Sequence, residues 1–256
     1  NIILSVDTTM SSQYSSITIY SDISETDEGH SLTLDAGNSS VYFYGNIGTE
    51  NPITNLEVRS NVDIYSDITT VGSQKYLGSV IIRDSLILTT PSSINFGSTL
   101  DAINSAQSNL VIHGETGIAL SADVGDVTAF QSIKFEGPVS LLGSVSISTK
   151  DGAIHFNSTI VSAGHYGLRL NAGLANVTLE DSLGFDGHLD VNDRTTNGLG
   201  AITFDSPVIF GRTSACTSCG LIIATDNQPI TLNYSLNDAV NGRHDLIISA
   251  GTSQVN

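Results

Sequence analysis

The sequence contains no tryptophan, one methionine, two cysteines and five prolines among its 256 residues. Lysine and arginine together number 9, against 26 acidic residues. Surfaces that bind nucleic acid or anionic lipid need a basic footprint, so we expect neither as a partner. No apolar run approaches the roughly 18 residues of a membrane-spanning helix, so we expect no membrane insertion. The net charge of -17 favours a soluble, extracellular protein.

The motifs of several enzyme classes are also missing. The sequence has no P-loop, no dinucleotide-binding glycine fingerprint, no G-x-S-x-G, no HExxH and no EF-hand loop. The six histidines are scattered along the chain and form no spaced metal-ligand pattern. We therefore expect no catalytic residues, no metal site and no cofactor, with calcium binding at corner carboxylates as the one open alternative.

What the chain does contain is repetition. The pentapeptide Ile-Tyr-Ser-Asp-Ile occurs at residues 19–23 and again at residues 64–68. A second repeated word is Leu-x-Leu/Ile followed by Ala or Gly, which begins at Leu32, Leu110, Leu168 and Leu246. A third is Ile-x-Phe with an aliphatic residue four positions later, as in Ile94, Phe96 and Leu100; Ile133, Phe135 and Val139; Ile154, Phe156 and Ile160; and Ile202, Phe204 and Val208.

These words predict short strands with one face turned inward, because their apolar residues lie two apart. Gly and Asn between the words suit tight corners. We therefore predict an all-β, single-stranded parallel β-helix of about a dozen rungs, with roughly 20 residues in each rung. The offsets of 77 and of 58 to 60 between aligned stretches favour whole numbers of rungs. A β-sandwich is the competing fold, and Asp101–Ser108 is the best candidate for one or two helical turns.

The organisation along the chain predicts one continuous solenoid over residues 1–256, without a linker. Neither end shows an evident cap, so we expect a segment of a longer protein or a subunit that stacks end to end. Residues 181–200 are richer in polar side chains and are expected to protrude as a loop.

The only cysteine pair is Cys216 and Cys219. A redox-active C-x-x-C pair needs a βαβ pattern around it, and a zinc site needs two more ligands. We interpret the pair as a short disulfide that staples a surface turn in an oxidising compartment.

One polar cluster is a candidate contact for glycans. It consists of Asp181, Asp186, His188, Asp190, Asp193 and Arg194. Paired carboxylates with a nearby histidine and a basic residue are typical of β-helix polysaccharide hydrolases, whereas the lyases use calcium with an arginine or lysine base. A solvated loop with no catalytic role explains the same residues, and we favour that interpretation.

Several tyrosines are expected on the outside. If Phe43 is buried, strand alternation turns Tyr42 and Tyr44 outward. Tyr20 and Tyr65 each follow a core isoleucine of the repeated pentapeptide, so they are also expected to face out. Such rings either stack on sugars or simply cover the sheet, and we favour covering.

With the words Leu-x-Leu-x-Ala-Gly and Ile-x-Phe-x-Ser-Thr-Ile, and with Gly-Ser-Gln-Lys-Tyr-Leu-Gly-Ser-Val at residues 72–80, the chain resembles a known group. It is similar to the repeat region of large secreted bacterial surface proteins of the filamentous-haemagglutinin and autotransporter-passenger type. The resemblance covers residues 30–180 and weakens after 185. It implies a right-handed helix that is exported and used for attachment, spacing or fibre building.

The leading functional prediction is thus a non-catalytic, extracellular structural or adhesive segment. Its expected partners are a glycan or protein receptor at a cell surface, or further copies of the chain stacked end to end. The alternative is a β-helix carbohydrate-active enzyme, a polysaccharide hydrolase or lyase, since fold does not fix function. An ice-binding solenoid is disfavoured, because threonine does not recur at one fixed rung position.

Overall fold

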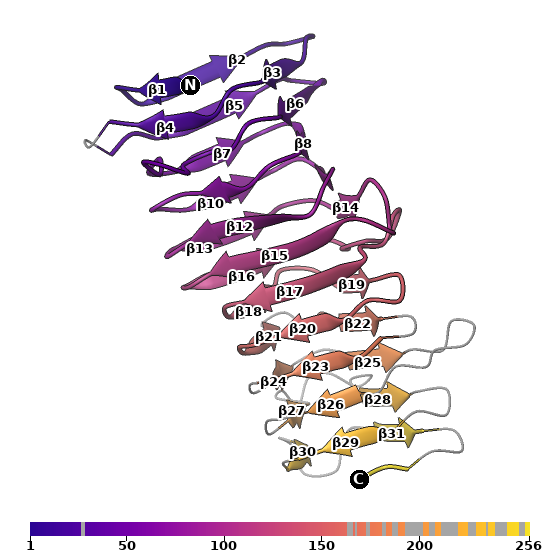
Figure 1. Ribbon diagram of the computed structural model, residues 1–256. Helices are drawn as coiled ribbons and strands as arrows, with labels where there is room; N and C mark the ends of the chain where they lie inside the picture. The colour runs from indigo at the N-terminus through magenta and orange to yellow at the C-terminus, as the bar shows by residue number, and fades with distance from the viewer. Residues whose placement is uncertain are drawn as a thin grey trace.

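The structure, a computed structural model, describes residues 1–26, 29–162, 166, 168–172, 175–180, 183–185, 189–192, 202–204, 208–210, 220–224, 229–233, 235–238, 245–250 and 254–256. Every regular element among these residues is a β-strand, and the strands pair in parallel (Figure 1). The chain winds into a parallel β-solenoid, which confirms the predicted all-β β-helix. The strands form three faces, here called face 1, face 2 and face 3.

Face 1 is one continuous sheet of eleven strands. In stacking order its strands are β2 (Thr8–Ser11), β5 (Leu32–Asp35), β7 (Leu56–Val58), β10 (Gln74–Tyr76), β13 (Ser93–Phe96), β16 (Gly117–Leu120), β18 (Val139–Leu141), β21 (Ile160–Ser162), β24 (Leu183–Phe185), β27 (Val208–Phe210) and β30 (Leu236–Asp238).

Face 2 consists of two five-stranded sheets. Bridges from Leu100 to Val124 and from Val124 to Ile147 join the two. The strands are β3 (Ile17–Ile19), β6 (Ser40–Phe43), β8 (Asn61–Ile64), β11 (Val80–Ile82) and β14 (Leu100–Ala102), followed by β19 (Val145–Ser148), β22 (Leu168–Asn171), β25 (Leu189–Asn192), β28 (Gly220–Ala224) and β31 (Asp245–Ser249).

Face 3 has a two-stranded sheet and an eight-stranded sheet. Ile47 bridges to Ile23 and to Ile68 and so connects them. The strands are β1 (Ile2–Leu4) and β4 (Ile23–Glu25), then β9 (Ile68–Thr69), β12 (Leu86–Thr90), β15 (Asn109–Gly114), β17 (Ser132–Glu136), β20 (Ile154–Phe156), β23 (Val177–Leu179), β26 (Ile202–Phe204) and β29 (Ile230–Leu232).

The chain visits face 1, face 2 and face 3 in that order, turn after turn. From β2 to β21 it makes about seven turns. The turns differ in length: hydrogen bonds between successive turns join residues 18 apart at Asn55 and Ser73, and 24 apart at Asp22 and Asn46. The solenoid therefore keeps its three faces while its corners vary.

The core lies inside this coil and is built from alternate strand residues. Leu32 and Leu34 of β5 are fully buried, whereas Thr33 between them is not. Two phenylalanines of the repeated words stack inside the core on successive turns: the rings of Phe135 and Phe156 are parallel within 6°, with centroids 4.6 Å apart. The buried apolar side chains of the described residues form one cluster.

A polar pair is also buried in this core. The Tyr76 hydroxyl donates to Oε1 of Gln74 over 2.9 Å, and Nε2 of Gln74 donates to the Thr89 carbonyl over 2.8 Å. Both residues are fully buried, and burial raises the pKa of Tyr76. These are the Gln and Tyr of the Gly-x-Gln-x-Tyr segment, so that segment places a satisfied hydrogen-bond pair inside the solenoid.

Two expectations from the sequence are wrong. The 77-residue offset, which aligns Leu56 with Ile133, does not mark whole rungs, because Leu56 lies on face 1 and Ile133 lies on face 3. Each word encodes a local strand–corner–strand unit that any face can use. Asp101–Ser108 is not helical: Asp101 belongs to β14, and the following turn is closed by Asn104, whose Oδ1 accepts from the Ala106 amide. Among the described residues, no helix is long and apolar enough to cross a membrane.

Candidate functional site

The described part of the chain carries a regular row of three surface tyrosines, Tyr20, Tyr44 and Tyr65, called here the tyrosine ladder. They follow β3, β6 and β8 directly, at the corner where face 2 turns into face 3. The amide of Tyr44 donates to the Ile19 carbonyl, and that of Tyr65 donates to the Phe43 carbonyl, each over 2.9 Å. The three residues therefore hold the same position in three successive turns.

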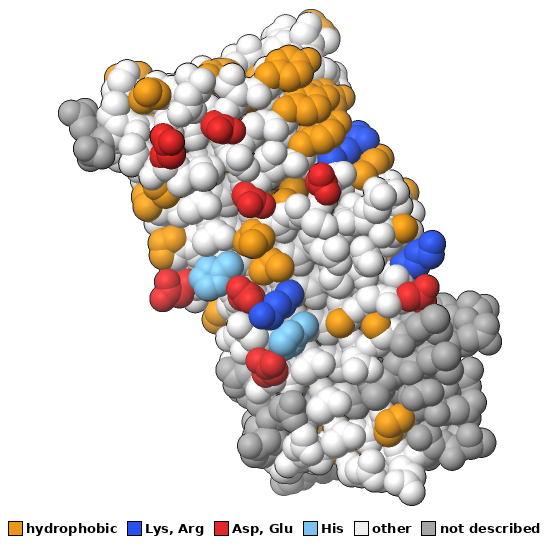
Figure 2. Space-filling view, viewed as in Figure 1, with side chains coloured by type: hydrophobic (Ala, Val, Ile, Leu, Met, Phe, Trp, Pro, Cys, Tyr) orange, Lys and Arg blue, Asp and Glu red, His pale blue; other side chains and the backbone are white. Residues whose placement is uncertain are grey.

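The rings of the tyrosine ladder stack on one another. The centroids of Tyr20 and Tyr44 are 5.1 Å apart with 12° between the planes, and those of Tyr44 and Tyr65 are 4.2 Å apart with 26°. Tyr20 is 77% exposed and Tyr44 is 39% exposed. Figure 2 shows hydrophobic side chains gathered at this corner, in the upper right of the view, beside a basic side chain. The prediction that these tyrosines face outward is confirmed, and the stack is an additional finding.

Arg83 holds the corresponding position in the next turn, where its amide donates to the Ile64 carbonyl. Its guanidinium carbon lies 5.7 Å from the centroid of the Tyr65 ring, within the range of a cation–π contact. Nη2 of Arg83 also lies 2.6 Å from Oδ2 of Asp63, whose side chain is 7% exposed. The arginine closes one end of the stack, and Asp63 balances its charge.

Hydrogen bonding within the stack affects its titration. A side-chain hydrogen bond with Tyr65 raises the pKa of Tyr44 above the usual value for a phenol.

A second row runs beside the tyrosine ladder, two residues further along each turn. It consists of Asp22, Asn46 and Asp67, called here the corner ladder. Oδ1 of Asp22 accepts from the Asn46 amide, Oδ1 of Asn46 from the Asp67 amide, and Oδ1 of Asp67 from the Ile87 amide, over 2.8, 3.2 and 2.8 Å. Each side chain thus satisfies the backbone of the next turn, which fixes the corner and the rings beside it.

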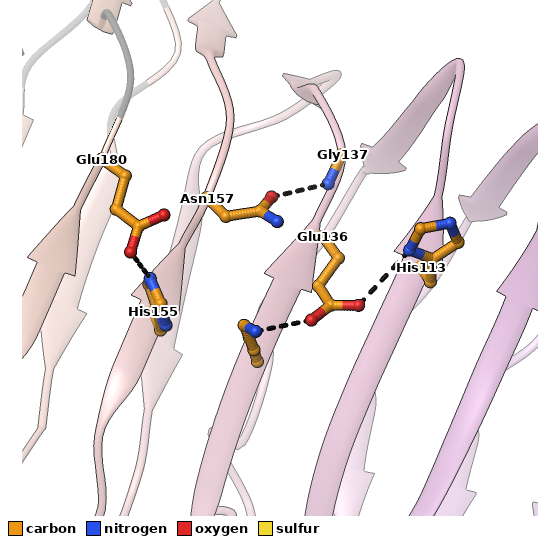
Figure 3. A network of polar contacts seen from close by, with 7 residues as sticks. His113, Glu136, Gly137, His155, Asn157 and Glu180 are labelled. Carbon is orange, nitrogen blue, oxygen red and sulfur yellow. Dashed lines mark hydrogen bonds and ion pairs between the residues drawn. The ribbon is translucent and has the colours of Figure 1, made fainter.

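A network of charged side chains lies on the outside of face 3 (Figure 3). Nδ1 of His113, on β15, lies 3.3 Å from Oε2 of Glu136, and Nζ of Lys134 lies 2.5 Å from its Oε1. One turn further on, Nε2 of His155 lies 2.7 Å from Oε1 of Glu180. The Lys134 ammonium, and after it His113, lowers the pKa of Glu136. The sequence places these side chains outward, but it does not reveal which turns they join.

A polar hollow of about 470 Å³ lies at the corner between face 2 and face 3 further along the solenoid. Its lining includes Ser105, Asp126, Lys150, Asp151 and Asn171. It contains no aromatic side chain, and among the described residues no three His, Cys, Asp or Glu side chains converge as metal ligands. The hollow can therefore form hydrogen bonds with a ligand but offers no aromatic ring on which a ligand could stack.

The site residues expected from the sequence lie mostly outside the described part of the chain. This holds for the cysteine pair, Cys216 and Cys219, and for Asp181, Asp186, His188, Asp193 and Arg194. Only the backbone of Asp190 is described: it lies in β25, where it pairs with Arg169 and Ile222. Within the segment expected to protrude, residues 183–185 and 189–192 are strands of face 1 and face 2.

Comparison with protein-family models, with curated proteins and with solved structures finds no match. The likeness to bacterial surface-protein repeats therefore rests on the sequence words alone.

Proposed function

We propose that this chain is a non-catalytic structural and adhesive segment of a secreted bacterial surface protein or fibre, located outside the cell. The observation that carries the proposal is the tyrosine ladder, in which one outward position holds a stacked ring in three successive turns, exposed at Tyr20 and Tyr44 and half-buried at Tyr65. A stacked solenoid with one apolar core holds such side chains rigidly and in register. Rigid repetition suits attachment and spacing, because few degrees of freedom are lost when the surface binds.

A right-handed coil and kinship with filamentous-haemagglutinin and autotransporter-passenger repeats follow from the sequence resemblance. A length of about a dozen rungs follows from the repeat period of roughly 20 residues, and a Cys216–Cys219 disulfide follows from the only cysteine pair in the sequence. The proposed partners are a glycan or protein receptor at a cell surface and further copies of the chain. No cofactor is required for attachment, and calcium at corner carboxylates is compatible with it.

The test is attachment of the fluorescently labelled chain to immobilised polysaccharides and to cultured cells, with release of reducing sugar measured on the same samples. Saturable attachment without sugar release is expected. Release of sugar at a rate proportional to the protein concentration, or a complete lack of attachment, would contradict the proposal.

One observation favours a second function, a carbohydrate-active enzyme. On face 3 the Glu136 carboxylate lies between Lys134 and His113, which brings together an acid and two basic groups. If this cluster cleaves a polysaccharide, Glu136→Gln abolishes the release of sugar while leaving attachment unchanged. Glu57→Gln, which changes a carboxylate on face 1, is the matched control.

A further inference from the structure

We propose that the tyrosine ladder and the corner ladder together bind a neutral, hydroxyl-rich polysaccharide that lies along the solenoid axis. This inference rests on the proposed adhesive function and names the class of ligand. The site is the strip that runs from Tyr20 to Arg83 over four turns at the corner between face 2 and face 3.

The aromatic part of the strip supplies contact area that is already ordered. One face of the Tyr20 ring packs on Tyr44, and the side chain is still 77% exposed, so its other face is open to a sugar ring. Tyrosine gives a large amphipathic contact at a low cost in conformational entropy. Stacking between turns lowers that cost further, because the rings are held before the ligand arrives.

The polar part of the strip suits hydroxyl groups. Tyrosine hydroxyls both donate and accept hydrogen bonds, and they repeat once in each turn. The corner ladder adds carboxylate and amide groups beside them, with Oδ1 of Asp22, Asn46 and Asp67 fixed on the backbone of the next turn. Asp22 and Asp67 are exposed, so their carboxylates also face solvent. Aromatic surface flanked by planar polar groups matches a sugar, which has both apolar C–H patches and hydroxyls.

Charge selects against acidic ligands. The chain carries a net charge of -17. The basic residue of the strip, Arg83, is paired with Asp63 at 2.6 Å and stacks on Tyr65. A uronate or sulfated glycan would meet exposed carboxylates without a spare cation, and like charges held close together repel. The strip therefore fits a neutral glycan.

Spacing selects a polymer over a single sugar. Successive turns of a parallel solenoid repeat at ~4.8 Å, which is close to the length of one hexopyranose unit in an extended chain. Tyr20, Tyr44 and Tyr65 hold one position in three such turns, so three neighbouring sugar units can each lie beside one tyrosine of the stack, with the open ring face at Tyr20. Repeated weak contacts on one chain add to a useful affinity.

The test is affinity electrophoresis of the full chain in gels that contain hydroxyethyl cellulose, galactomannan or polygalacturonate. We expect the wild-type chain to bind at least one neutral polymer about tenfold more tightly than polygalacturonate. The variants Tyr20→Ala and Tyr20→Ala with Tyr44→Ala should weaken that binding about tenfold or more, the loss of about 1.4 kcal/mol that one good stacking contact represents. Tyr14→Ala is the matched control, because Tyr14 is 83% exposed but lies outside the strip.

Circular dichroism checks that each variant is folded, and Tyr20→Ala, at the exposed end of the stack, is the variant least able to disturb the fold. Equal binding by wild type and by a folded Tyr20→Ala and Tyr44→Ala double variant would overturn the inference, as would a preference for polygalacturonate or no binding to the neutral polymers. If the double variant binds the neutral polymers as wild type does and the wild-type chain attaches to cells, the inference fails and the adhesive function stands. If the wild-type chain attaches to nothing, the proposed function fails as well.

Discussion

Tyr44 and Tyr65 lie ring on ring, with centroids 4.2 Å apart, although a full turn of the solenoid separates them in sequence. Their stacking follows from the backbone, since the amide of Tyr65 bonds to the carbonyl of Phe43, the residue before Tyr44. Parallel pairing thus converts a repeated sequence position into a continuous surface.

Removal of the Tyr65 ring should lower the free energy of unfolding by about 1.5 kcal/mol, because stacked aromatic pairs contribute up to about that much. Tyr65→Phe keeps the ring and should cost much less. It removes the hydroxyl that raises the pKa of Tyr44, so that pKa should fall toward its ordinary value. Urea unfolding and an ultraviolet titration of the tyrosines measure the two effects. A Tyr65→Ala variant as stable as Tyr14→Ala would refute the contribution of the stack.

Gly45, between Tyr44 and Asn46, should not tolerate a side chain. A Cβ at this position would lie 2.4 Å from the carbonyl carbon of Ser21 in the preceding turn. We expect Gly45→Ala to destabilise the fold by about 2 kcal/mol through overpacking. Gly97→Ala is the control, since its Cβ would meet nothing closer than 3.3 Å and should cost about 1 kcal/mol or less. Equal unfolding midpoints for the two variants would contradict this prediction.

Loss of Arg83 should lower the free energy of unfolding, because it leaves a buried carboxylate without its ionic partner. The side chain of Asp63 is 7% exposed, and Arg83→Met would leave it without its ionic partner. We expect a loss of about 3 kcal/mol, and a recovery of much of it when Asp63→Leu is added. Chemical denaturation of the single and double variants measures both. If the double variant is less stable than Arg83→Met alone, the interpretation is wrong.

The network on face 3 should make stability depend on pH through Glu136. Lys134 and His113 lower the pKa of Glu136 in the folded state. A lowered folded pKa adds stability above the unfolded pKa, and this is lost as the pH falls through the folded value. Lys134→Met should therefore cost about 0.5 kcal/mol at neutral pH and nothing once Glu136 is protonated.

Urea unfolding across the acidic range measures this difference, and a carboxyl-carbon NMR titration should show the pKa of Glu136 rising in Lys134→Met. Lys75→Met is the control for the loss of one exposed positive charge. If both lysine variants lose the same stability at every pH, the ion pair contributes nothing specific.

The sequence predicted the parallel solenoid because its signal is local. Leu32 and Leu34 are two apart and both buried, and Phe135 and Phe156 stack inward as the repeated words indicate. The identical pentapeptides occupy equivalent positions in the fold. Ile19 and Ile64 lie on face 2, Ile23 and Ile68 lie on face 3, and the two copies are two turns apart.

The sequence could not predict the contacts between turns. The turns differ in length, so the register in which successive strands pair also differs from turn to turn. His113 and Glu136 meet only because β15 and β17 pair in one particular register, which no local pattern specifies. The sequence indicated only part of the tyrosine ladder. Tyr20 and Tyr65 share a repeated word, but Tyr44 is followed by Gly45 and Asn46 instead of Ser and Asp. The 77-residue offset wrongly predicted whole rungs because matching sequence words occur on different faces.

Electron microscopy of the purified chain, with and without calcium, tests the central claim most directly. The proposed length of about a dozen rungs, each ~4.8 Å high, predicts rigid rods on the order of 60 Å long, or longer fibres if copies stack end to end. Rods or fibres of uniform width would support an extended attachment or spacer segment. Round particles without a long axis would contradict it.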